Sequence, residues 1–371
     1  MGKTMLEVQE KEREHHIPQT MSAGFLDRVL EVGIRQIPVP QVSGTEVLVK
    51  VMAVGVCGSD VHYYAHGKIG NRMVQYPHIQ GHECAGIVVS VGERVKRFRV
   101  GDRVAIEPGT TCMSCRWCKE GRYNLCPEVQ FLSTPPVKGA FVQYLKHRED
   151  FLFPLPDSLS FEQATLAEPL SVGIHAVRRG RIKPGDTVAV FGMGPVGLLT
   201  VMAAKAFGAT TIIASDVEPL RLAAATKMGA THVVDITKQS VDDVIAGVTG
   251  GEGVDAILET SGNEKALQSA VPLIKRGGAL VVIGFPAAEE VPLNITLMLQ
   301  KEIDMYAVYR YTNTYPQAIA LLAEGAFPTS ELLTDFYSLD QLQQAMEQAR
   351  TNKSGSLKVI VYPNPSSNDQ P

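Results

Sequence analysis

The sequence predicts an α/β protein of two domains, in which a doubly wound parallel sheet follows a mostly antiparallel β domain. A length of 371 residues exceeds what one ordinary hydrophobic core covers. Short β-rich runs separated by Gly, Pro and Asp fill the first part of the chain. From residue 183 onward, apolar runs of strand length alternate with helical segments, which is typical of a parallel sheet covered on both faces.

The predicted elements follow from local patterns. Apolar and β-branched residues predict strands at 47–54, 86–91 and 103–107, and residues 168–179 read as a helix. In the second part we expect strands at 188–191, 211–215, 232–235, 256–259 and 279–284, with helices at 198–207 and 217–228. The tail from about residue 309 returns to mixed structure and ends in a strand at 357–362.

Composition limits the possible partners and locations. The formal net charge is −4 and no basic run stands out, which argues against nucleic acid or an anionic membrane as a partner. Residues 1–20 are polar, lack the apolar core of a signal peptide and are expected to form a flexible extension, so a cytoplasmic protein is predicted. The longest uncharged stretch, 187–204, contains three glycines and a proline, which favours a buried strand–turn–helix over a membrane span.

Four residues are candidates for one catalytic zinc site. Cys57, His82, Glu83 and Glu168 supply the thiolate, imidazole and carboxylate groups that zinc prefers, and a catalytic zinc keeps one position open for water or substrate. Gly81 lets the backbone turn just before the adjacent pair His82-Glu83.

Four of the six cysteines cluster, at positions 112, 115, 118 and 126. Two alternatives to metal binding are a disulfide pair and a redox dithiol. A cytoplasmic chain of this size is not expected to carry disulfides, and redox Cys-x-x-Cys pairs open a helix in a βαβ unit, unlike this Gly- and Arg-rich segment. The spacing therefore predicts a structural zinc held by Cys112, Cys115, Cys118 and Cys126. Cys84 has no partner in spacing and is expected to be a buried small hydrophobe.

A glycine-rich motif predicts a dinucleotide site. Gly192, Gly194 and Gly197 follow a predicted strand and precede a helix, and Asp216 ends the next strand. The helix N-terminus would bind the pyrophosphate, and Asp216 would accept hydrogen bonds from the ribose and repel a 2′-phosphate, which favours NAD over NADP. The Arg221 side chain has two possible roles in cofactor binding, because it could bind a phosphate or stack on adenine. A glycine-rich turn without a ligand is the remaining alternative.

Several motifs resemble the zinc-dependent medium-chain alcohol dehydrogenases, most closely their sorbitol (L-iditol 2-) dehydrogenase branch. The resemblance covers residues 21–362 and rests on the segments VGVCGSDVHYY (54–64), GHE (81–83), GRYNLCP (121–127), STPP (133–136), EPLSVG (168–173) and YRY (309–311). Four features depart from that branch: Gln80 at a usually apolar position, Tyr309 in place of the usual Phe, the N-terminal extension, and the complete four-cysteine lobe, which animal sorbitol dehydrogenases have lost.

The resemblance implies a discontinuous, GroES-like catalytic domain formed by residues 21–168 and 308–371, and an NAD-binding Rossmann domain at 169–307. It implies that Cys57, His82 and Glu83 are direct zinc ligands, and that Glu168 holds the zinc-bound water or substrate, with occasional direct ligation. The implied substrate contacts are Tyr63, Phe131, Thr134, Glu168, Arg310 and Tyr311. The implied further cofactor contacts are Val196, Ile283, Gly284, Phe285, Tyr309 and Arg310. A homotetramer is the implied assembly, with a dimer as the second choice.

The expected reaction is oxidation of a sugar alcohol to a ketose, in which zinc acts as a Lewis acid and hydride passes to NAD. Ser59 and His62 are candidates for a proton relay, although a surface histidine is the alternative for His62. Asp60 is expected to orient His82, with Lys358 as a possible ion-pair partner of Asp60. A secondary-alcohol, butanediol or threonine dehydrogenase is the alternative enzyme. Two further alternatives are a zinc-free quinone reductase and a non-enzymatic NAD sensor. Each would lack some of the zinc-ligand or relay residues named above, all of which are present in this sequence.

Overall fold

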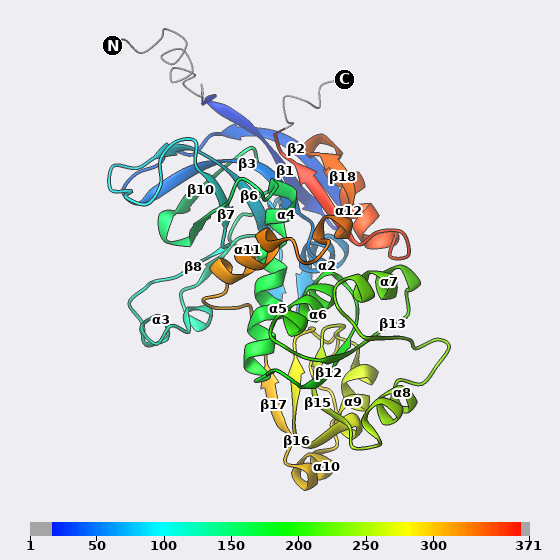
Figure 1. Ribbon diagram of the computed structural model, residues 1–371. Helices are drawn as coiled ribbons and strands as arrows, with labels where there is room; N and C mark the ends of the chain where they lie inside the picture. Colours follow the sequence, from blue (N-terminus) through cyan, green and yellow to red (C-terminus); the bar gives the residue numbers. More distant parts are fainter. Residues whose placement is uncertain (1–16, 365–371) are drawn as a thin grey trace.

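The computed structural model describes residues 17–364. Most of the predicted N-terminal extension, residues 1–16, and residues 365–371 lie outside the described part. The first strand, β1 (Thr20–Arg28), begins at the end of the predicted extension and forms an antiparallel hairpin with β2 (Glu31–Pro38). Figure 1 shows two bodies: the upper one contains the blue and cyan segments and the red C-terminal strands, and the lower one contains most of the green and yellow segments.

A seven-stranded sheet forms the centre of the first body. Its order is β11-β7-β6-β3-β19-β18, and β10 also pairs with β3. All of its pairings are antiparallel except that of β18 with β19. The C-terminal strands therefore complete a sheet that the N-terminal half begins. The strands are β3 (Glu46–Gly55), β6 (Glu83–Val91), β7 (Arg103–Ile106), β10 (Tyr144–Arg148), β11 (Leu152–Pro154), β18 (Leu333–Ser338) and β19 (Lys358–Tyr362).

Short helices and two-stranded ribbons complete this body. Helix α2 (Gly58–His66) follows β3 directly, and α12 (Leu342–Thr351) packs against α2 and β19. Helix α4 (Phe161–Thr165) contacts β3 and β6, and α11 (Tyr315–Glu324) lies against α5. A lobe that carries α3 (Arg116–Lys119) projects from the sheet (Figure 1). The small ribbons are β4 (Lys68–Ile69) with β5 (Arg72–Met73), and β8 (Gly109–Thr110) with β9 (Gln130–Phe131).

The second body is a six-stranded, fully parallel sheet with the order β14-β13-β12-β15-β16-β17. The order reverses at β12, as expected for a doubly wound sheet. The strands are β12 (Thr187–Phe191), β13 (Thr211–Asp216), β14 (His232–Asp235), β15 (Val254–Glu259), β16 (Ile274–Val282) and β17 (Asp304–Ala307). The helices are α5 (Ala167–Arg179), α6 (Pro195–Ala206), α7 (Pro219–Lys227), α8 (Val241–Thr249), α9 (Glu264–Leu273) and α10 (Ile295–Lys301).

Two hydrophobic cores cover the two faces of the parallel sheet. Along β12, Val188 and Val190 belong to one core, while Ala189 and Phe191 belong to the other. This alternation follows from the two-residue period of a strand. Because each face of β12 packs against a core, the strand is apolar on both faces. The fold class predicted from the sequence is confirmed.

Strand β16 differs most from its prediction, because it begins at Ile274 rather than at residue 279 and ends at Val282. Ile274 pairs with Val254 before a register shift, so the strand includes Gly277 and Gly278, which the predicted strand leaves out. None of the helices in residues 17–364 is long and apolar enough to cross a membrane.

Candidate active site and metal sites

The antiparallel pairing of β3 with β6 brings the first three predicted zinc ligands together. Gly55, the last residue of β3, pairs with Glu83, the first residue of β6. Cys57 therefore lies beside His82 and Glu83, and one ligand atom from each lies within 4.8 Å of the others. A Cβ at Gly55 would collide with the Glu83 carboxylate, so the close approach requires glycine. His82 and Glu83 are buried, whereas Cys57 is partly accessible.

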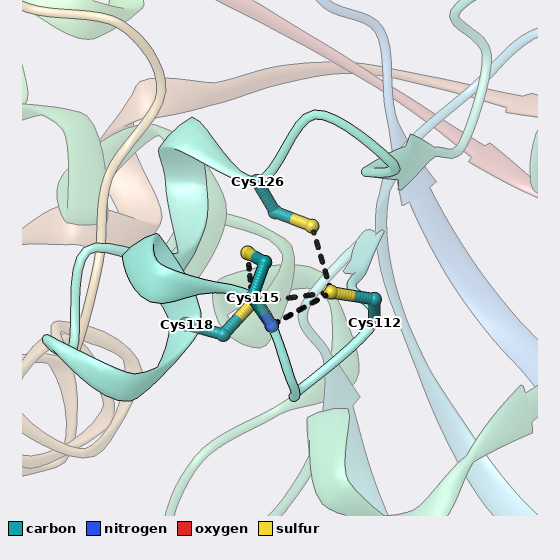
Figure 2. Close-up of side chains that lie close together, drawn as sticks. All are labelled: Cys112, Cys115, Cys118 and Cys126. Carbon is teal, nitrogen blue, oxygen red and sulfur yellow. Dashed lines mark hydrogen bonds between the residues drawn. The ribbon is translucent and has the colours of Figure 1, made fainter.

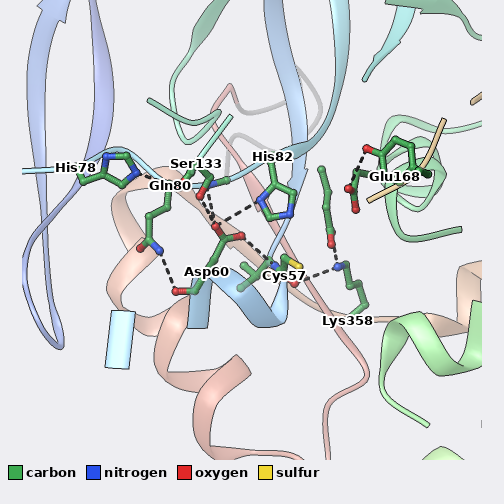
Figure 3. A network of polar contacts seen from close by, with 12 residues as sticks. Cys57, Asp60, His78, Gln80, His82, Ser133, Glu168 and Lys358 are labelled. Atoms are coloured by element: carbon green, nitrogen blue, oxygen red, sulfur yellow. Dashed lines mark hydrogen bonds and ion pairs between the residues drawn. The ribbon is translucent and has the colours of Figure 1, made fainter. Parts of the chain in front are cut away.

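Asp60 fixes the backbone around this cluster. Its buried carboxylate accepts hydrogen bonds from the amides of Cys57 and Gly81, both at 3.1 Å, and from the Ser133 hydroxyl at 2.7 Å (Figure 3). Asp60 Oδ1 lies 3.6 Å from Nδ1 of His82, a separation that gives attraction without a full hydrogen bond. The carboxylate thus lies beside His82, on the side of Nδ1, as the sequence predicts.

Gln80, the departure noted in the sequence, is a buried part of the same support. Its side-chain amide donates to the carbonyl oxygen of Asp60 at 2.8 Å. A polar residue is stable here because its donor group is hydrogen-bonded.

The prediction that Lys358 pairs with Asp60 is wrong. Its ammonium forms an ion pair with Glu83 and donates to the carbonyl oxygen of Val56 at 3.0 Å (Figure 3). Lys358 begins β19, whose Ile360 pairs with Gly55 at the end of β3, so the sheet brings its side chain to the glutamate rather than to α2.

Burial and charge act in opposite directions within the cluster. Burial alone would lower the pKa of His82, but attraction to Asp60 and Cys57 outweighs it and raises the pKa well above its usual value. Burial would likewise lower the pKa of Lys358, but the charge of Glu83 raises it. Burial would raise the pKa of Asp60, but the attraction of His82 lowers it. The site therefore holds several charges that compensate one another.

Glu168 lies near this cluster but outside it. Its carboxylate is not among the three ligand atoms that lie within 4.8 Å of one another, and it accepts a hydrogen bond from the Tyr311 hydroxyl at 2.9 Å (Figure 3). Burial, together with repulsion from Glu83, raises the pKa of Glu168 to about 7, against the attraction of His82. This position fits a group that faces the cluster rather than a member of its ligand set.

Phe131 links the predicted substrate residues to the cluster, since its ring lies 5.6 Å from the ring of His82 and it lines a small cavity together with Arg310 and Tyr311. The guanidinium of Arg310 lies 4.1 Å from the centre of the Phe131 ring, and its Nη1 is buried without a hydrogen-bond partner. Tyr63 is buried in the core beside the cluster, and Thr134 is partly buried, with its backbone amide bonded to the carbonyl of Phe131 at 3.0 Å. A buried N–H of Arg310 without a partner favours a polar ligand at this position.

The predicted relay residues lie in the first turns of α2, the helix that Cys57 precedes. Ser59 is partly buried and His62 is exposed. No hydrogen bond joins the two side chains in the described part of the chain. The ring of His62 lies 5.9 Å from that of His66, and the partial burial of its ring, together with the charges of His66 and Lys353, lowers the pKa of His62.

The four clustered cysteines form a second candidate metal site. Their sulfur atoms all lie within 4.8 Å of one another, and none forms a disulfide (Figure 2). Hydrogen bonds from the backbone amides of Ser114 and Cys115 lower the pKa of Cys112 to about 6, whereas burial raises the pKa of Cys126 to about 12, so without a metal ion the cluster favours a thiolate at Cys112 rather than at Cys126. Cys84 is free and buried, as predicted.

The glycine motif forms the turn between β12 and α6. Gly192 has a φ of +89°, which favours glycine, and a Cβ at Gly197 would collide with the carbonyl oxygen of Gly192. Gly194 is the N-cap of α6, and a Cβ there would point into open space. The turn therefore leaves the helix N-terminus open for an anion beside Gly194 and the partly buried Val196.

Asp216 ends β13 beside this turn. Its carboxylate accepts hydrogen bonds from the amides of Met193 at 2.5 Å, Val217 at 2.7 Å and Glu218 at 3.0 Å. Arg221, on α7, has a buried Nε without a hydrogen-bond partner. The remaining predicted cofactor residues follow β16 and its edge neighbour β17: Ile283 is buried, Gly284 contacts Gly262, Phe285 is 69% exposed, and the Tyr309 hydroxyl accepts from Arg72 at 2.6 Å.

No motif in the sequence indicates a second buried carboxyl group near the substrate residues. Glu107 follows β7, accepts a hydrogen bond from the Tyr123 hydroxyl at 2.8 Å, and has its pKa raised to about 7 by burial. Its carbonyl oxygen bonds Nε2 of the buried His147 at 2.9 Å. A small cavity of about 10 Å³ separates Glu107 from Arg310 and Tyr311. An isolated acidic residue beside a strand carries no motif, so only packing identifies it.

Comparison with known proteins places the chain in a family. Residues 43–157 match the alcohol dehydrogenase GroES-like domain, and residues 195–324 match the zinc-binding dehydrogenases. The chain is 57% identical to sorbitol dehydrogenase of Bacillus subtilis, over 94% of this chain and 99% of that protein. It is 40% identical to sorbitol dehydrogenase of Mus musculus, over 92% of this chain and 94% of that protein.

Solved structures agree with this placement. The 2R,3R-butanediol dehydrogenase of Bacillus subtilis superposes with a TM-score of 0.84 at 34% identity, covering 93% of this chain and all of that one. An Escherichia coli oxidoreductase of unknown specificity gives a TM-score of 0.88 at 38% identity, covering 92% of this chain and 99% of that one. The prediction of zinc and a nicotinamide cofactor is thereby confirmed for the family. The chain belongs to the zinc-dependent medium-chain dehydrogenases and is an oxidoreductase of that family.

Proposed function

We propose that this enzyme oxidises a sugar alcohol of the sorbitol type to a ketose, with transfer of hydride to NAD. The observation that carries the proposal is the pair of polar side chains beside the Cys57, His82 and Glu83 cluster: Arg310 has a buried N–H without a partner, and the buried Glu168 lies close enough to interact with the charges of His82 and Glu83. A simple alcohol needs no such groups, whereas the several hydroxyls of a polyol can satisfy them. The 57% identity to a sorbitol dehydrogenase supports the same substrate class.

The residues of the cluster fit a catalytic zinc ion. Thiolate, imidazole and carboxylate are donors that zinc prefers, and three protein ligands leave a fourth position open. Cys57, His82 and Glu83 would hold the ion, and the four cysteines of the lobe would hold a second, structural one. The catalytic ion would lower the pKa of the substrate hydroxyl.

The other residues hold and orient the substrate. Arg310 and Glu168 would bind hydroxyls next to the reacting carbon, while Phe131 and Tyr63 wall the pocket and exclude water. Thr134 and Tyr311 complete the set of proposed contacts. Asp60 keeps His82 in place and Lys358 offsets the charge of Glu83.

Ser59 and His62 remain the proposed proton exit. Both lie on α2 within five residues of Cys57, and His62 is exposed, so that it can release a proton to solvent. In residues 17–364 no direct hydrogen bond joins the two side chains, so we propose that a water molecule, or a hydroxyl of the substrate or cofactor, bridges them.

For the cofactor we propose that the open N-terminus of α6 binds the pyrophosphate and Asp216 the adenosine ribose, with NAD preferred over NADP. Arg221, Val196 and residues 283–285 and 309–310 would complete the site. We also propose the domain division predicted from the sequence, with residues 21–168 and 308–371 forming the catalytic domain and 169–307 the NAD-binding domain. The homotetramer and the cytoplasmic location remain predictions.

A panel of alcohols tests the function. NADH formation should be measured with sorbitol, xylitol, L-iditol, 2,3-butanediol, 2-propanol and threonine, in wild type and in Arg310→Ala. We expect the highest kcat/KM on a polyol, and a loss in Arg310→Ala that affects polyols but spares 2-propanol. A preference of the wild type for 2,3-butanediol, 2-propanol or threonine would replace the polyol assignment.

A further inference from the structure

The four-cysteine lobe, residues 112–126, lies against the segment that carries two of the proposed substrate contacts. This segment, residues 309–313, is called here the substrate loop. The side chain of Asn124 donates to the carbonyl oxygen of Tyr309 at 2.9 Å, and the Tyr123 hydroxyl accepts from the amide of Asn313 at 2.9 Å. The carbonyl oxygen of Gly121 accepts from the side chains of Thr312 at 2.7 Å and Asn313 at 2.8 Å.

The substrate loop has a backbone conformation that needs such support. Arg310 and Asn313 have φ angles of +57° and +54°, in the left-handed region that non-glycine residues rarely adopt. Residues persist there only where surrounding contacts over-determine them. Three of the four hydrogen bonds from the lobe fall on Tyr309 and Asn313, so they bracket Arg310 and Tyr311 on both sides.

The bracketed residues are those that face the active site. The guanidinium of Arg310 lies 4.1 Å from the centre of the Phe131 ring, and the Tyr311 hydroxyl donates to Glu168 at 2.9 Å. Displacement of the loop backbone by about 1 Å would misalign both groups with respect to the substrate. The lobe touches neither side chain through these bonds, and therefore acts on them through the backbone.

We infer that the four-cysteine lobe positions the substrate loop, and that Asn124 and Tyr123 are positioning residues for the oxidised alcohol. The inference rests on the proposed function, in which Arg310 and Tyr311 contact the polyol. Cys118 and Cys126 flank Gly121, Tyr123 and Asn124 in the chain, and Figure 2 shows the four sulfur atoms converging within this lobe. A metal ion held by the four thiolates would fix the segment that holds the loop, so the lobe links a structural metal to substrate binding.

A pair of matched asparagine variants tests the inference. Asn124→Asp keeps the shape of the side chain but replaces the donor to Tyr309 with an acceptor. Asn364→Asp is the control, because Asn364 is also buried and donates to two backbone carbonyls, at 2.9 and 2.7 Å, but these belong to Val51 and Gln143. Both variants should lower the free energy of unfolding. A change in substrate kinetics that occurs only in Asn124→Asp therefore reports positioning of the substrate loop rather than general destabilisation.

We expect Asn124→Asp to raise the KM for the polyol roughly tenfold while the KM for NAD stays within about twofold, as the loss of one or two hydrogen bonds predicts. Tyr123→Phe, which removes only the hydroxyl, should show a smaller change of the same kind. Asn364→Asp should leave both constants close to those of the wild type. An equal rise in Asn364→Asp, or no rise in either lobe variant, would overturn the inference.

Amide hydrogen exchange supplies a readout that does not depend on activity. Residues 309–313 should exchange faster in Asn124→Asp, and in protein whose lobe metal has been removed by a chelator, but not in Asn364→Asp. Unchanged exchange of this segment in both conditions would also overturn the inference. If the wild type oxidises no polyol, the proposed function fails, but the exchange experiment still decides whether the lobe positions the loop.

Discussion

The ammonium of Lys358 forms an ion pair with the carboxylate of Glu83 in the protein interior, where the two side chains are 2% and 1% exposed. One partner is a proposed zinc ligand at the start of β6, and the other begins the C-terminal strand β19. Among the described residues, the last strand therefore compensates charge in a site whose proposed ligands come from the first third of the chain.

Lys358→Met should destabilise the protein, because it leaves a buried carboxylate without its partner. We expect a loss of about 3–5 kcal/mol in the free energy of unfolding of zinc-free protein, and a smaller loss with zinc bound, since the ion would itself compensate Glu83. Lys227→Met is the control, because the Lys227–Glu331 pair is exposed and should cost at most about 1 kcal/mol. Equal effects of the two substitutions in urea unfolding would contradict the role given to Lys358.

Elemental analysis should find two zinc ions per chain, one for each ligand set. Cys115→Ala should lose one ion and lower the melting temperature, because a closed thiolate cage couples metal binding to folding. Cys84→Ala is the matched control, since Cys84 is buried but belongs to neither set. It should retain both ions. A single ion in the wild type would count against the structural site.

Glu83 and Glu168 should differ in what their loss affects. Glu83→Gln should lower zinc affinity, because an amide oxygen is a weaker ligand than a carboxylate. Glu168→Gln should keep the ion but lose much of the turnover, because Glu168 lies outside the three-atom cluster and faces it. Zinc titration followed by single-turnover hydride transfer separates the two roles. If Glu168→Gln lost the metal and Glu83→Gln retained it, the assignments would have to be exchanged.

Asp216→Ala should weaken NAD binding and narrow the preference for NAD over NADP, because a ribose acceptor and a repulsive charge both disappear. Asp216 also accepts the amide of Met193 in the glycine turn, so some loss of turn rigidity is expected. Asp216→Asn separates the contributions, since it removes the charge and keeps an acceptor. The measurement is kcat/KM with each cofactor. Equal use of NADP and NAD by the wild type would refute the assignment.

Glu107 should make stability depend on pH. Burial raises its pKa from the usual 4.5 to about 7, so the folded protein holds a proton that the unfolded chain has released between these values. Its contribution to stability is therefore complete below about pH 4.5 and is lost as the pH rises through 7, by up to about 3 kcal/mol. Glu107→Gln should remove this loss. The free energy of unfolding of the variant should therefore rise relative to that of the wild type from pH 5 to pH 8. If the free energies of unfolding of variant and wild type, measured in urea, changed in parallel with pH, Glu107 would not titrate in this range.

The sequence by itself determined the fold class and the chemistry of the sites. Periodicity separated the antiparallel from the parallel part, and the glycine turn at 192–197 was identified because its residue types are required by backbone geometry. The spacing of the four cysteines is likewise sufficient to predict a shared site, because the four thiols lie within fifteen consecutive residues and converge without help from distant segments.

Only the tertiary structure decided which distant side chains meet. Lys358 pairs with Glu83 rather than Asp60, because the register of β19 on β3 sets where its side chain points. Glu107 and the bonds from Asn124 and Tyr123 to the substrate loop carry no motif at all. Such contacts depend on how sheets, helices and loops pack after each has formed, and local sequence patterns do not encode that packing.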